Sequence, residues 1–294
     1  MKKNLVKKLV KKEFILFLLV GAFIIYINID LFVYASNRAF DKKNLCEIPG
    51  PNKIFTSNAE LCKGVYRWPF DILGGITIKG DEITLNCNGA KLIGAGITHG
   101  IDILGNNNTV KNCYMENWFH AIHSEGSGNL IMDNTVVDYK EYGIHLKNGY
   151  AIIRDNTILN KNQNKDQNLS LAAIGLYPTS QGSEISNNNI DSSAYFGIYD
   201  HGIQDSRTLL LNNTISNSVH GIFLSEGSNL VTAKNNYINN VKIGINLGKF
   251  SENNFVKENR ISNSKNGVFI QRGALKNSIE GNIIEATDNL IIAI

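Results

Sequence analysis

Outside residues 1–35, the sequence has a net charge close to zero. The chain of 294 residues contains 29 lysines and arginines and 26 aspartates and glutamates. Residues 1–35 hold six of the lysines against two acidic residues, which leaves 23 basic and 24 acidic residues in the remainder. Nucleic-acid-binding domains present a basic surface, so the composition argues against nucleic acid as a partner.

Helical periodicity is also missing. After residue 35, no segment of ten or more residues combines apolar residues at helical spacing with capping residues, so we expect almost no helix there. Instead, apolar residues alternate over runs of three to five residues, and clusters of Asn, Gly, Ser and Asp separate the runs. Short alternating runs between turn-forming residues are typical of β-strands.

The strands recur with a fixed period. Segments that begin at Gly197, Gly221, Gly244 and Gly267 all read Gly-Ile or Gly-Val, and these glycines lie 24, 23 and 23 residues apart. Related segments begin at residues 100, 121, 143 and 175. A period of this length is typical of a solenoid. Asparagines keep the same step at Asn112, Asn134, Asn156, Asn188, Asn213, Asn236, Asn259 and Asn282.

We interpret the repeat as an all-β fold, a single-stranded right-handed parallel β-helix over residues 83–294 with coils of about 23 residues. Each coil contains three short strands and pairs with the next at about 4.8 Å. The repeating asparagines are expected to be structural, because Asn tolerates the left-handed conformation of a tight turn and stacked Asn side chains hydrogen-bond to each other. The step from Gly143 to Gly175 is longer, and the polar residues 161–168 are expected to form a protruding loop.

Two segments precede the repeats. Residues 1–35 combine lysine pairs, an apolar run from Phe14 to Ile27 and the small-residue ending Val33-Tyr34-Ala35, which predicts a cleaved signal peptide or a retained membrane anchor. In both cases the body is expected to be exported to the periplasm or the extracellular space, and an uncleaved segment would make the membrane a partner. Residues 36–82 lack the period and are predicted to form a linker and an N-terminal cap.

The four cysteines and the end of the chain leave alternatives open. An even number of cysteines in an exported protein allows three disulfide pairings among Cys46, Cys62, Cys87 and Cys113. Buried free thiols are an equal alternative for the last two. The chain ends on an apolar strand at residues 290–294, so we expect a truncated reading frame or an open edge that associates with a partner or a second copy.

One face of the predicted solenoid carries the candidate site. In the repeated strand, alternation directs the second and fourth residues inward and the third outward, and all six histidines fall within a window of six positions around it. Histidines and aromatic residues gathered on one face are typical of a binding surface. No Cys or Met joins the stacked His123 and His145, so no metal site is predicted. The outward column reads Asp102, His123, His145, Tyr177, Tyr199, Phe223, Asn246 and Phe269.

Three segments resemble the catalytic β-helix of the mannuronan C-5-epimerases, namely 196–201 (Phe-Gly-Ile-Tyr-Asp-His), 220–223 (His-Gly-Ile-Phe) and 267–273 (Gly-Val-Phe-Ile-Gln-Arg-Gly). In that family the first segment reads Tyr-Gly-x-Asp-Pro-His, and a second Asp follows one coil later. His201 matches the family's His, whereas Phe196, Tyr199 and Ser225 stand at the Tyr and the two Asp positions. Residues 83–96 also resemble periplasmic β-helix proteins, including the copper-maturation accessory of nitrous oxide reductase, and this second resemblance implies only the fold.

The resemblance to the epimerases implies chemistry on an acidic polysaccharide. Removing the proton next to a uronate carboxylate needs a base and neutralisation of charge. We expect His201 to be the base and Tyr199 the acid, with Asp200 beside them. Reprotonation would make the protein an epimerase, and expulsion of the glycosidic oxygen would make it a lyase. The expected substrate-binding residues are His123, His145, Lys147, Tyr177, Arg207, His220, Phe223, Glu226, Phe269 and Arg272.

Three interpretations therefore stand at the level of sequence. The first is an exported β-helix protein that binds an acidic polysaccharide and modifies it as a lyase or an epimerase. The second is a non-catalytic carbohydrate-binding or structural scaffold that uses the same face. The third is a metal-handling accessory protein, for which the clustered histidines would supply ligands. Calcium is the one cofactor left open.

Overall fold

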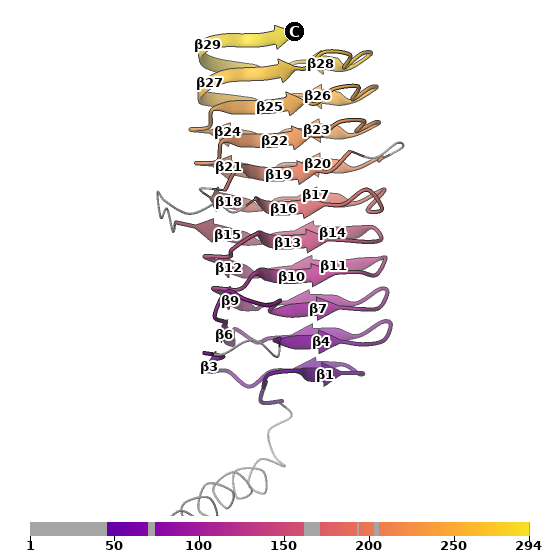
Figure 1. Cartoon of the computed structure of the whole chain (residues 1–294), viewed down its shortest axis with the longest axis vertical. Coiled ribbons are helices and arrows are strands. Elements are labelled where there is room, and N and C mark those ends of the chain that lie inside the picture. Colours follow the sequence, from indigo (N-terminus) through magenta and orange to yellow (C-terminus); the bar gives the residue numbers. More distant parts are fainter. Residues whose placement is uncertain (1–45, 70–73, 162–170, 193, 203–205, 294) are drawn as a thin grey trace, which may run out of the picture. The chain divides into compact units, whose positions relative to one another are not determined.

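The computed structural model describes residues 46–294 except 70–73, 162–170, 193, 203–205 and 294. The described residues form strands and turns without a helix, and none of them forms a helix that is long and apolar enough to span a membrane. The strands pair in parallel as successive coils of one solenoid (Figure 1). The predicted all-β parallel β-helix is confirmed. The predicted signal or anchor segment, residues 1–35, and the polar loop at 162–168 lie outside the described residues.

Each coil contributes strands to three parallel stacks. The second stack is a separate 10-stranded sheet, whereas the first and third belong to one 19-stranded sheet because the long strands β27 and β29 take part in both. The first stack contains β1 (Lys53–Phe55), β4 (Ile76–Ile78), β7 (Ile101–Ile103), β10 (His120–Ser124), β13 (Tyr142–Leu146), β16 (Ala172–Leu176), β19 (Phe196–Asp200), β22 (His220–Leu224), β25 (Ile243–Leu247), β27 (Arg260–Ile270) and β29 (Ile283–Ala293).

The other two stacks consist of shorter strands. The second contains β2 (Ala59–Glu60), β5 (Thr84–Asn86), β8 (Thr109–Lys111), β11 (Asn129–Met132), β14 (Ala151–Arg154), β17 (Glu184–Ser186), β20 (Leu209–Leu211), β23 (Thr232–Lys234), β26 (Phe255–Lys257) and β28 (Ser278–Glu280). The third contains β3 (Val65–Arg67), β6 (Lys91–Ile93), β9 (Tyr114–Glu116), β12 (Thr135–Val137), β15 (Thr157–Asn160), β18 (Asn189–Ser192), β21 (Thr214–Ser216), β24 (Tyr237–Asn239) and the first parts of β27 and β29.

The interior of the solenoid is a column of aliphatic side chains. Ile122 pairs with Ile144 in the next coil, and Ile144 pairs with Ile174. All three side chains are fully buried, as expected for the second residue of the repeated strand. Burying such a side chain stabilises the fold by about 1.5–3 kcal/mol. Because every coil buries its apolar side chains against its neighbours, stability comes from the stack rather than from any single coil.

A ladder of buried asparagines runs along the turn between the second and third stacks. The Oδ1 atom of Asn213 accepts hydrogen bonds from the backbone N–H and the side-chain amide of Asn188, each at 3.0 Å. Its own amide donates to Asn236 in the next coil at 3.1 Å. The asparagines are therefore structural, as expected. The ladder comprises Asn134, Asn156, Asn188, Asn213, Asn236, Asn259 and Asn282.

The left-handed residue of each turn is not the ladder asparagine but the residue before it. Asn212 and Asn235, for example, have φ angles of 53° and 56°. Asn112 has a φ of 56° and takes this preceding position, so it is not a ladder member. The sequence marker had combined two neighbouring positions with different tasks, one that turns the chain and one that bonds the coils together.

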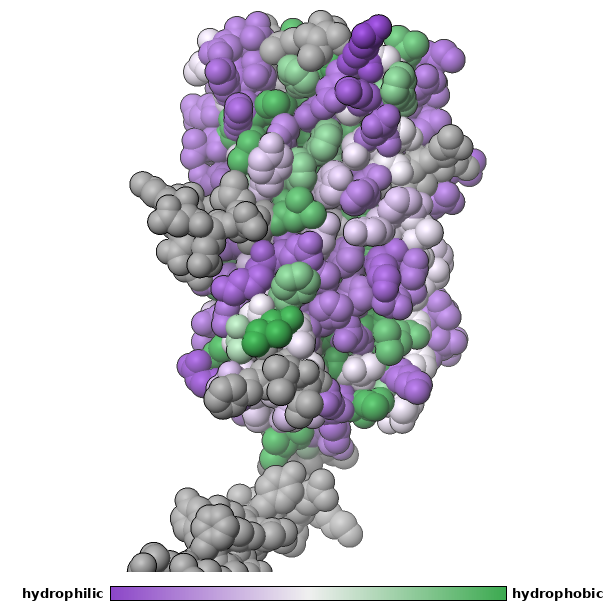
Figure 2. Space-filling model, viewed as in Figure 1, coloured by the Kyte–Doolittle hydropathy of each residue, from purple (hydrophilic) through white to green (hydrophobic). Residues whose placement is uncertain are grey.

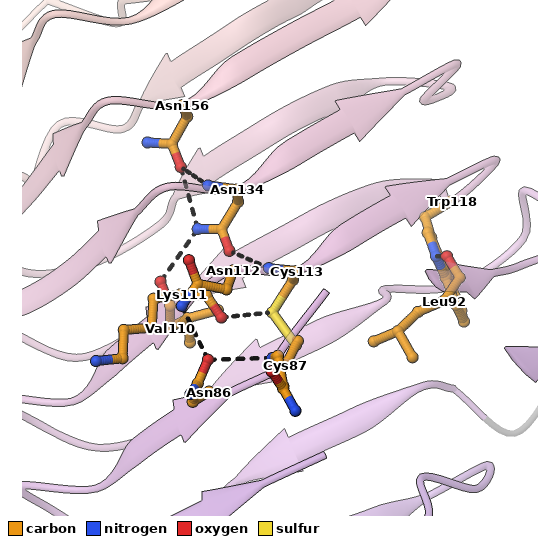
Figure 3. The surroundings of a disulfide bond; sticks show 11 residues. Asn86, Cys87, Leu92, Val110, Lys111, Asn112, Cys113, Trp118, Asn134 and Asn156 are labelled. Atoms are coloured by element: carbon orange, nitrogen blue, oxygen red, sulfur yellow. Dashed lines mark hydrogen bonds between the residues drawn. A yellow bond between two sulfur atoms is a disulfide. The ribbon is translucent and has the colours of Figure 1, made fainter. Parts of the chain in front are cut away.

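A disulfide bond replaces the asparagine ladder at its lower end (Figure 3). Cys113 takes the ladder position, because its N–H donates to Oδ1 of Asn134 at 3.0 Å. Its sulfur is bonded to Cys87 in the coil below. Cys46 and Cys62 form the second disulfide. No cysteine is left as a free thiol, so the alternative of buried thiols is wrong for Cys87 and Cys113.

The coils begin earlier than the sequence suggested. β1 pairs with β4, and β4 pairs with β7, so strands before residue 83 already belong to the stack in the region where a linker and cap were expected. This start was hard to recognise because residues 46–82 contain three prolines and lack an asparagine marker at the regular step.

The register of the long coil also differs from the expected one. Gly175 pairs with His145, and Leu176 pairs with Leu146. The repeated strand in this coil therefore has Ala173 at the repeated glycine position, two residues before the glycine that the sequence indicated. Tyr177 consequently does not belong to the predicted outward column, where Gly175 stands instead.

Candidate functional site

Each repeated strand of the first stack contains a corner, a place where two consecutive residues both face inward. The residue before this pair and the residue after it therefore both face outward. A Cβ atom on Gly221 would lie 2.6 Å from the carbonyl oxygen of Gly244 in the next coil and 2.5 Å from a core isoleucine, so this position faces inward. Ile222 is buried in the core as well. Two consecutive inward residues leave His220 and Phe223 on the same outer side, which strict alternation would not allow.

All six histidines of the chain lie in one network of contacting rings on this outer side. Neighbouring ring centroids are 4.3–5.6 Å apart. The network extends from β7 to β22, so it spans several coils without a break. We call it the ring network, and it consists of His99, Phe119, His120, His123, Tyr142, His145, Tyr177, Tyr195, Phe196, Tyr199, His201, His220 and Phe223.

The lower part of the ring network is a cluster of imidazoles held by carboxylates. Nε2 of His120 donates to Glu141 at 2.8 Å. Asp102 accepts from Nδ1 of His99 at 2.7 Å and from Nδ1 of His123 at 3.0 Å. The carboxylates therefore fix the orientation of three rings. His145 lies above His123, with 5.1 Å between the stacked ring centroids.

Burial controls the charge of this imidazole cluster. It lowers the pKa of His120 to about 2 and that of His145 to about 3, and the neighbouring imidazoles add to the effect. Both rings are therefore neutral at neutral pH. Burial alone would raise the pKa of Asp102, but its hydrogen bonds with His123 and His99 outweigh burial and lower the pKa to about 2. Asp102 is accordingly ionised.

Two of the neutral imidazoles have buried nitrogens without a partner. Neither nitrogen of His145 makes a hydrogen bond among the described residues, and Nδ1 of His120 makes none either. The side chains are only 5% and 6% exposed. Leaving a buried polar atom unsatisfied costs about 1–3 kcal/mol, so these nitrogens are a specific feature of the site.

The upper part of the ring network is aromatic rather than ionic. Phe196 stacks on Tyr199 at 4.5 Å and on Phe223 at 5.0 Å. The imidazole of His201 lies 4.7 Å from the rings of both Tyr199 and Tyr177. Burial raises the pKa of Tyr199, which keeps its phenol protonated. The predicted acid and base are thus neighbours.

Asp200, by contrast, points into the solenoid and not toward the outer side. It is the fourth residue of the repeated strand, in register with Leu176 and Leu224, and it is fully buried. Its carboxylate accepts hydrogen bonds from the N–H of Gly202 at 3.2 Å and the hydroxyl of Ser206 at 3.1 Å. Burial raises its pKa to about 6 despite these bonds. The expectation that it acts beside His201 on the face is therefore corrected, because alternation directs the two side chains to opposite sides.

The remaining predicted residues are distributed around this network. Phe269 continues the outward column, but Asn246 separates it from Phe223. Lys147 is exposed at the end of β13 and forms an ion pair with Glu125 at 2.9 Å. Arg207, Glu226 and Arg272 are exposed in the connections between the first and second stacks. On the side seen in Figure 2, hydrophobic residues form separate small areas among hydrophilic ones.

The predicted catalytic and substrate-binding residues did not include His99, Asp102, His120 or Glu141, although Asp102 stood in the outward column and the histidines in the window around it. The spacing of these residues contained a signal. One residue before the repeated Gly or Ala position stands His99 or His120, and two residues after it stands Asp102 or His123. Strict strand alternation places such pairs on opposite sides. Only the corner in the strand reveals that they share one side.

Similarity to the first of three known structures supports the fold. The chain is similar to the Dettilon tailspike protein (gp208), with a TM-score of 0.60 and 14% identity over 82% of this chain and 60% of that one. It therefore spans three-fifths of the tailspike chain's length. It is also similar to DFA-IIIase from Arthrobacter chlorophenolicus A6, with a TM-score of 0.49 and 14% identity over 83% of this chain and 70% of that one. A third similar structure is PfbA, a surface adhesin of Streptococcus pneumoniae, with a TM-score of 0.38 and 13% identity over 80% and 62% of the two chains.

Comparison at the level of sequence assigns the family. No curated protein matches the chain. A family model described as a right handed beta helix region matches residues 99–199 and 167–294, which together cover more than half of the chain. The chain belongs to the right-handed β-helix family.

Proposed function

We propose that the ring network binds a polysaccharide that lies along the axis of the solenoid. The observation that carries this proposal is the continuity of the network, whose rings stay in contact from β7 to β22. One coil rises about 4.8 Å, which is comparable to the length of one sugar unit. A glycan chain in this orientation would meet a similar row of side chains at each sugar.

The accessible rings are the ones that would contact sugars. Tyr177 and Tyr195 are 38% and 43% exposed, and His201, Tyr199 and Phe223 are partly exposed. Aromatic rings present a large apolar surface and, in tyrosine, a polar tip. This combination suits the alternating apolar and hydroxyl-bearing surfaces of a sugar ring.

Binding, rather than catalysis, is the function that the geometry supports best. His201 and Tyr199 remain adjacent and outward, but Asp200 is turned into the interior. The nearby ionic groups include the carboxylates of Asp102 and Glu125 as well as Lys147, so the charge around the network does not favour an acidic glycan over a neutral one. Export of the protein belongs to the same proposal and is supported by the two disulfide bonds, which persist in oxidising compartments.

The test is affinity electrophoresis of the full-length chain in gels that contain alginate, pectate or a neutral glucan. Tyr177→Ala and Tyr195→Ala should each weaken binding about fivefold, because one aromatic contact contributes roughly 1 kcal/mol. Tyr237→Ala is the matched control, since Tyr237 is 41% exposed but lies in β24 of the third stack. Equal retardation of all three variants, or no retardation of the wild type by any glycan, would contradict the proposal. Unsaturated products or proton exchange at C-5 would add lyase or epimerase activity.

A further inference from the structure

We propose that His120, His123 and His145 form a binding site for a divalent transition metal ion, with zinc as the ion that fits best. The three residues come from β10 and β13, which are paired strands of adjacent coils. One nitrogen of each ring lies within 4.8 Å of the corresponding nitrogens of the other two. These three histidines are buried members of the ring network and are not among the exposed rings proposed to contact sugars, although His145 contacts Tyr177.

The unpartnered nitrogens point to a ligand. His145 offers two buried nitrogens and His120 offers Nδ1, and none of the three has a hydrogen-bond partner in the part of the chain that the structure describes. Buried polar atoms are almost always paired, so unpaired ones in a native structure require an explanation. Metal coordination is a direct one, because a neutral imidazole binds a metal through its free nitrogen lone pair.

Carboxylates prepare two of the three rings for coordination. Glu141 accepts from Nε2 of His120, which leaves Nδ1 for the metal, and Asp102 accepts from Nδ1 of His123, which leaves Nε2. Such carboxylate–histidine pairs are the usual outer shell of zinc sites, where they fix the ring and raise its basicity. Two carboxylates also balance the two positive charges of the ion, which offsets the cost of placing it in a buried site.

The donor set selects the type of ion. Imidazole nitrogens favour zinc and the neighbouring transition metals, whereas calcium takes six to eight oxygens, so calcium does not fit this centre. Zinc–nitrogen bonds of about 2.0–2.1 Å in a tetrahedral site place the nitrogens about 3.4 Å apart. The side chain of His145, which no hydrogen bond holds among the described residues, would have to move to close the remaining gap. One candidate for the fourth position is Glu125, whose Oε1 lies 3.9 Å from Nε2 of His123.

The test uses the full-length chain after removal of metals with a chelator. Zinc binding is followed by titration calorimetry, and cobalt(II) replaces zinc as a probe because its absorption spectrum reports tetrahedral coordination. The informative variant is His145→Phe, which retains a ring to stack on Tyr142 but has no nitrogen. The matched control is His220→Phe, which removes another buried imidazole of the ring network that lies outside the three-histidine group.

We expect one zinc ion per chain, a cobalt spectrum typical of tetrahedral coordination, and loss of both in His145→Phe but not in His220→Phe. Glu141→Gln should weaken zinc binding about 10- to 100-fold, as changes in the outer shell typically do. Zinc should also raise the Tm of the wild type and of His220→Phe but not of His145→Phe, and this readout shows that each variant is folded. Absence of zinc binding by the wild type, or equal binding by His145→Phe, would overturn the proposal. Neither result depends on whether the protein binds a glycan.

Discussion

Replacing Asp200 by asparagine tests how the solenoid tolerates a charge in its core. Asp200 takes a position at which neighbouring coils place leucine, and burial raises its pKa from 3.8 to about 6. The variant Asp200→Asn keeps the shape of the side chain and one oxygen to accept from the N–H of Gly202, and its amide N–H can donate to the hydroxyl of Ser206, which then donates to Thr208. The substitution removes the ionisation. We expect it to be more stable than the wild type at neutral pH.

The magnitude follows from the pKa. A difference of about two pH units between the folded and unfolded carboxyl corresponds to about 3 kcal/mol, at 1.36 kcal/mol per unit. The folded state holds the proton more tightly than the unfolded chain, so Asp200 lowers stability as the pH rises from about 4 to 6, and the full cost persists above that range. The advantage of Asp200→Asn should therefore be about 3 kcal/mol near pH 7.5 and vanish near pH 4.

The assay is urea unfolding followed by far-ultraviolet circular dichroism across this pH range, with the difference between variant and wild type as the readout. Only the difference isolates Asp200, because the lowered pKa values of His120 and His145 act in both chains. Those imidazoles are neutral when folded, so they reduce stability as the pH falls below about 6.5. The control is Asp288→Asn at an exposed aspartate, where we expect a change within about 0.5 kcal/mol. A difference that does not vary with pH, or an Asp200→Asn chain that is less stable near neutrality, would refute the reasoning.

Three further perturbations probe the frame of the solenoid. Asn213→Ala should lower the free energy of unfolding by about 3 kcal/mol, because it leaves buried amide groups of two neighbouring coils unpaired; the exposed control Asn189→Ala, in β18, should change it by less than about 0.5 kcal/mol in the same urea titration. Gly221→Ala should destabilise by more than about 1 kcal/mol, since its Cβ would lie 2.6 Å from a carbonyl oxygen of the next coil, and an unchanged Tm would show that the corner is misplaced. Replacing Cys87 and Cys113 by serine should cost about 3 kcal/mol for a bond that links residues 26 apart, and the same loss on reduction of a chain in which Cys46 and Cys62 are already replaced by serine would confirm the cause.

The coil architecture was predictable because its two determinants are local. Each coil needs a residue that turns the chain and an asparagine that bonds to the next coil, and both recur in the sequence at the period of the fold. Where other residues replace them, the prediction failed. Ala173 stands in for glycine in the long coil, so the register there was placed two residues late. Cys113 stands in for asparagine near the start, so Asn112 was taken as a ladder member in its place.

The candidate site was only partly predictable because it depends on the corner in each repeated strand. The outward direction of His123 and Tyr199 follows from alternation, and the gathering of the histidines follows from their spacing. That His120 and His123 lie on the same side follows only from the two consecutive inward residues, Ala121 and Ile122. Likewise, the inward position of Asp200 follows from alternation, but its proximity to His201 in sequence suggested a shared role.

The corner in each repeated strand allows the outward surface of such a protein to evolve independently of its core. Because each coil offers two outward positions beside two inward ones, the residues that face a ligand and the residues that hold the frame are different sets. Exchanging the pair Phe196 and Tyr199 for the pair His120 and His123 would alter the chemistry of one coil without touching the aliphatic column or the asparagine ladder. A chain built in this way can acquire new specificities one coil at a time, by substitution of two side chains three residues apart.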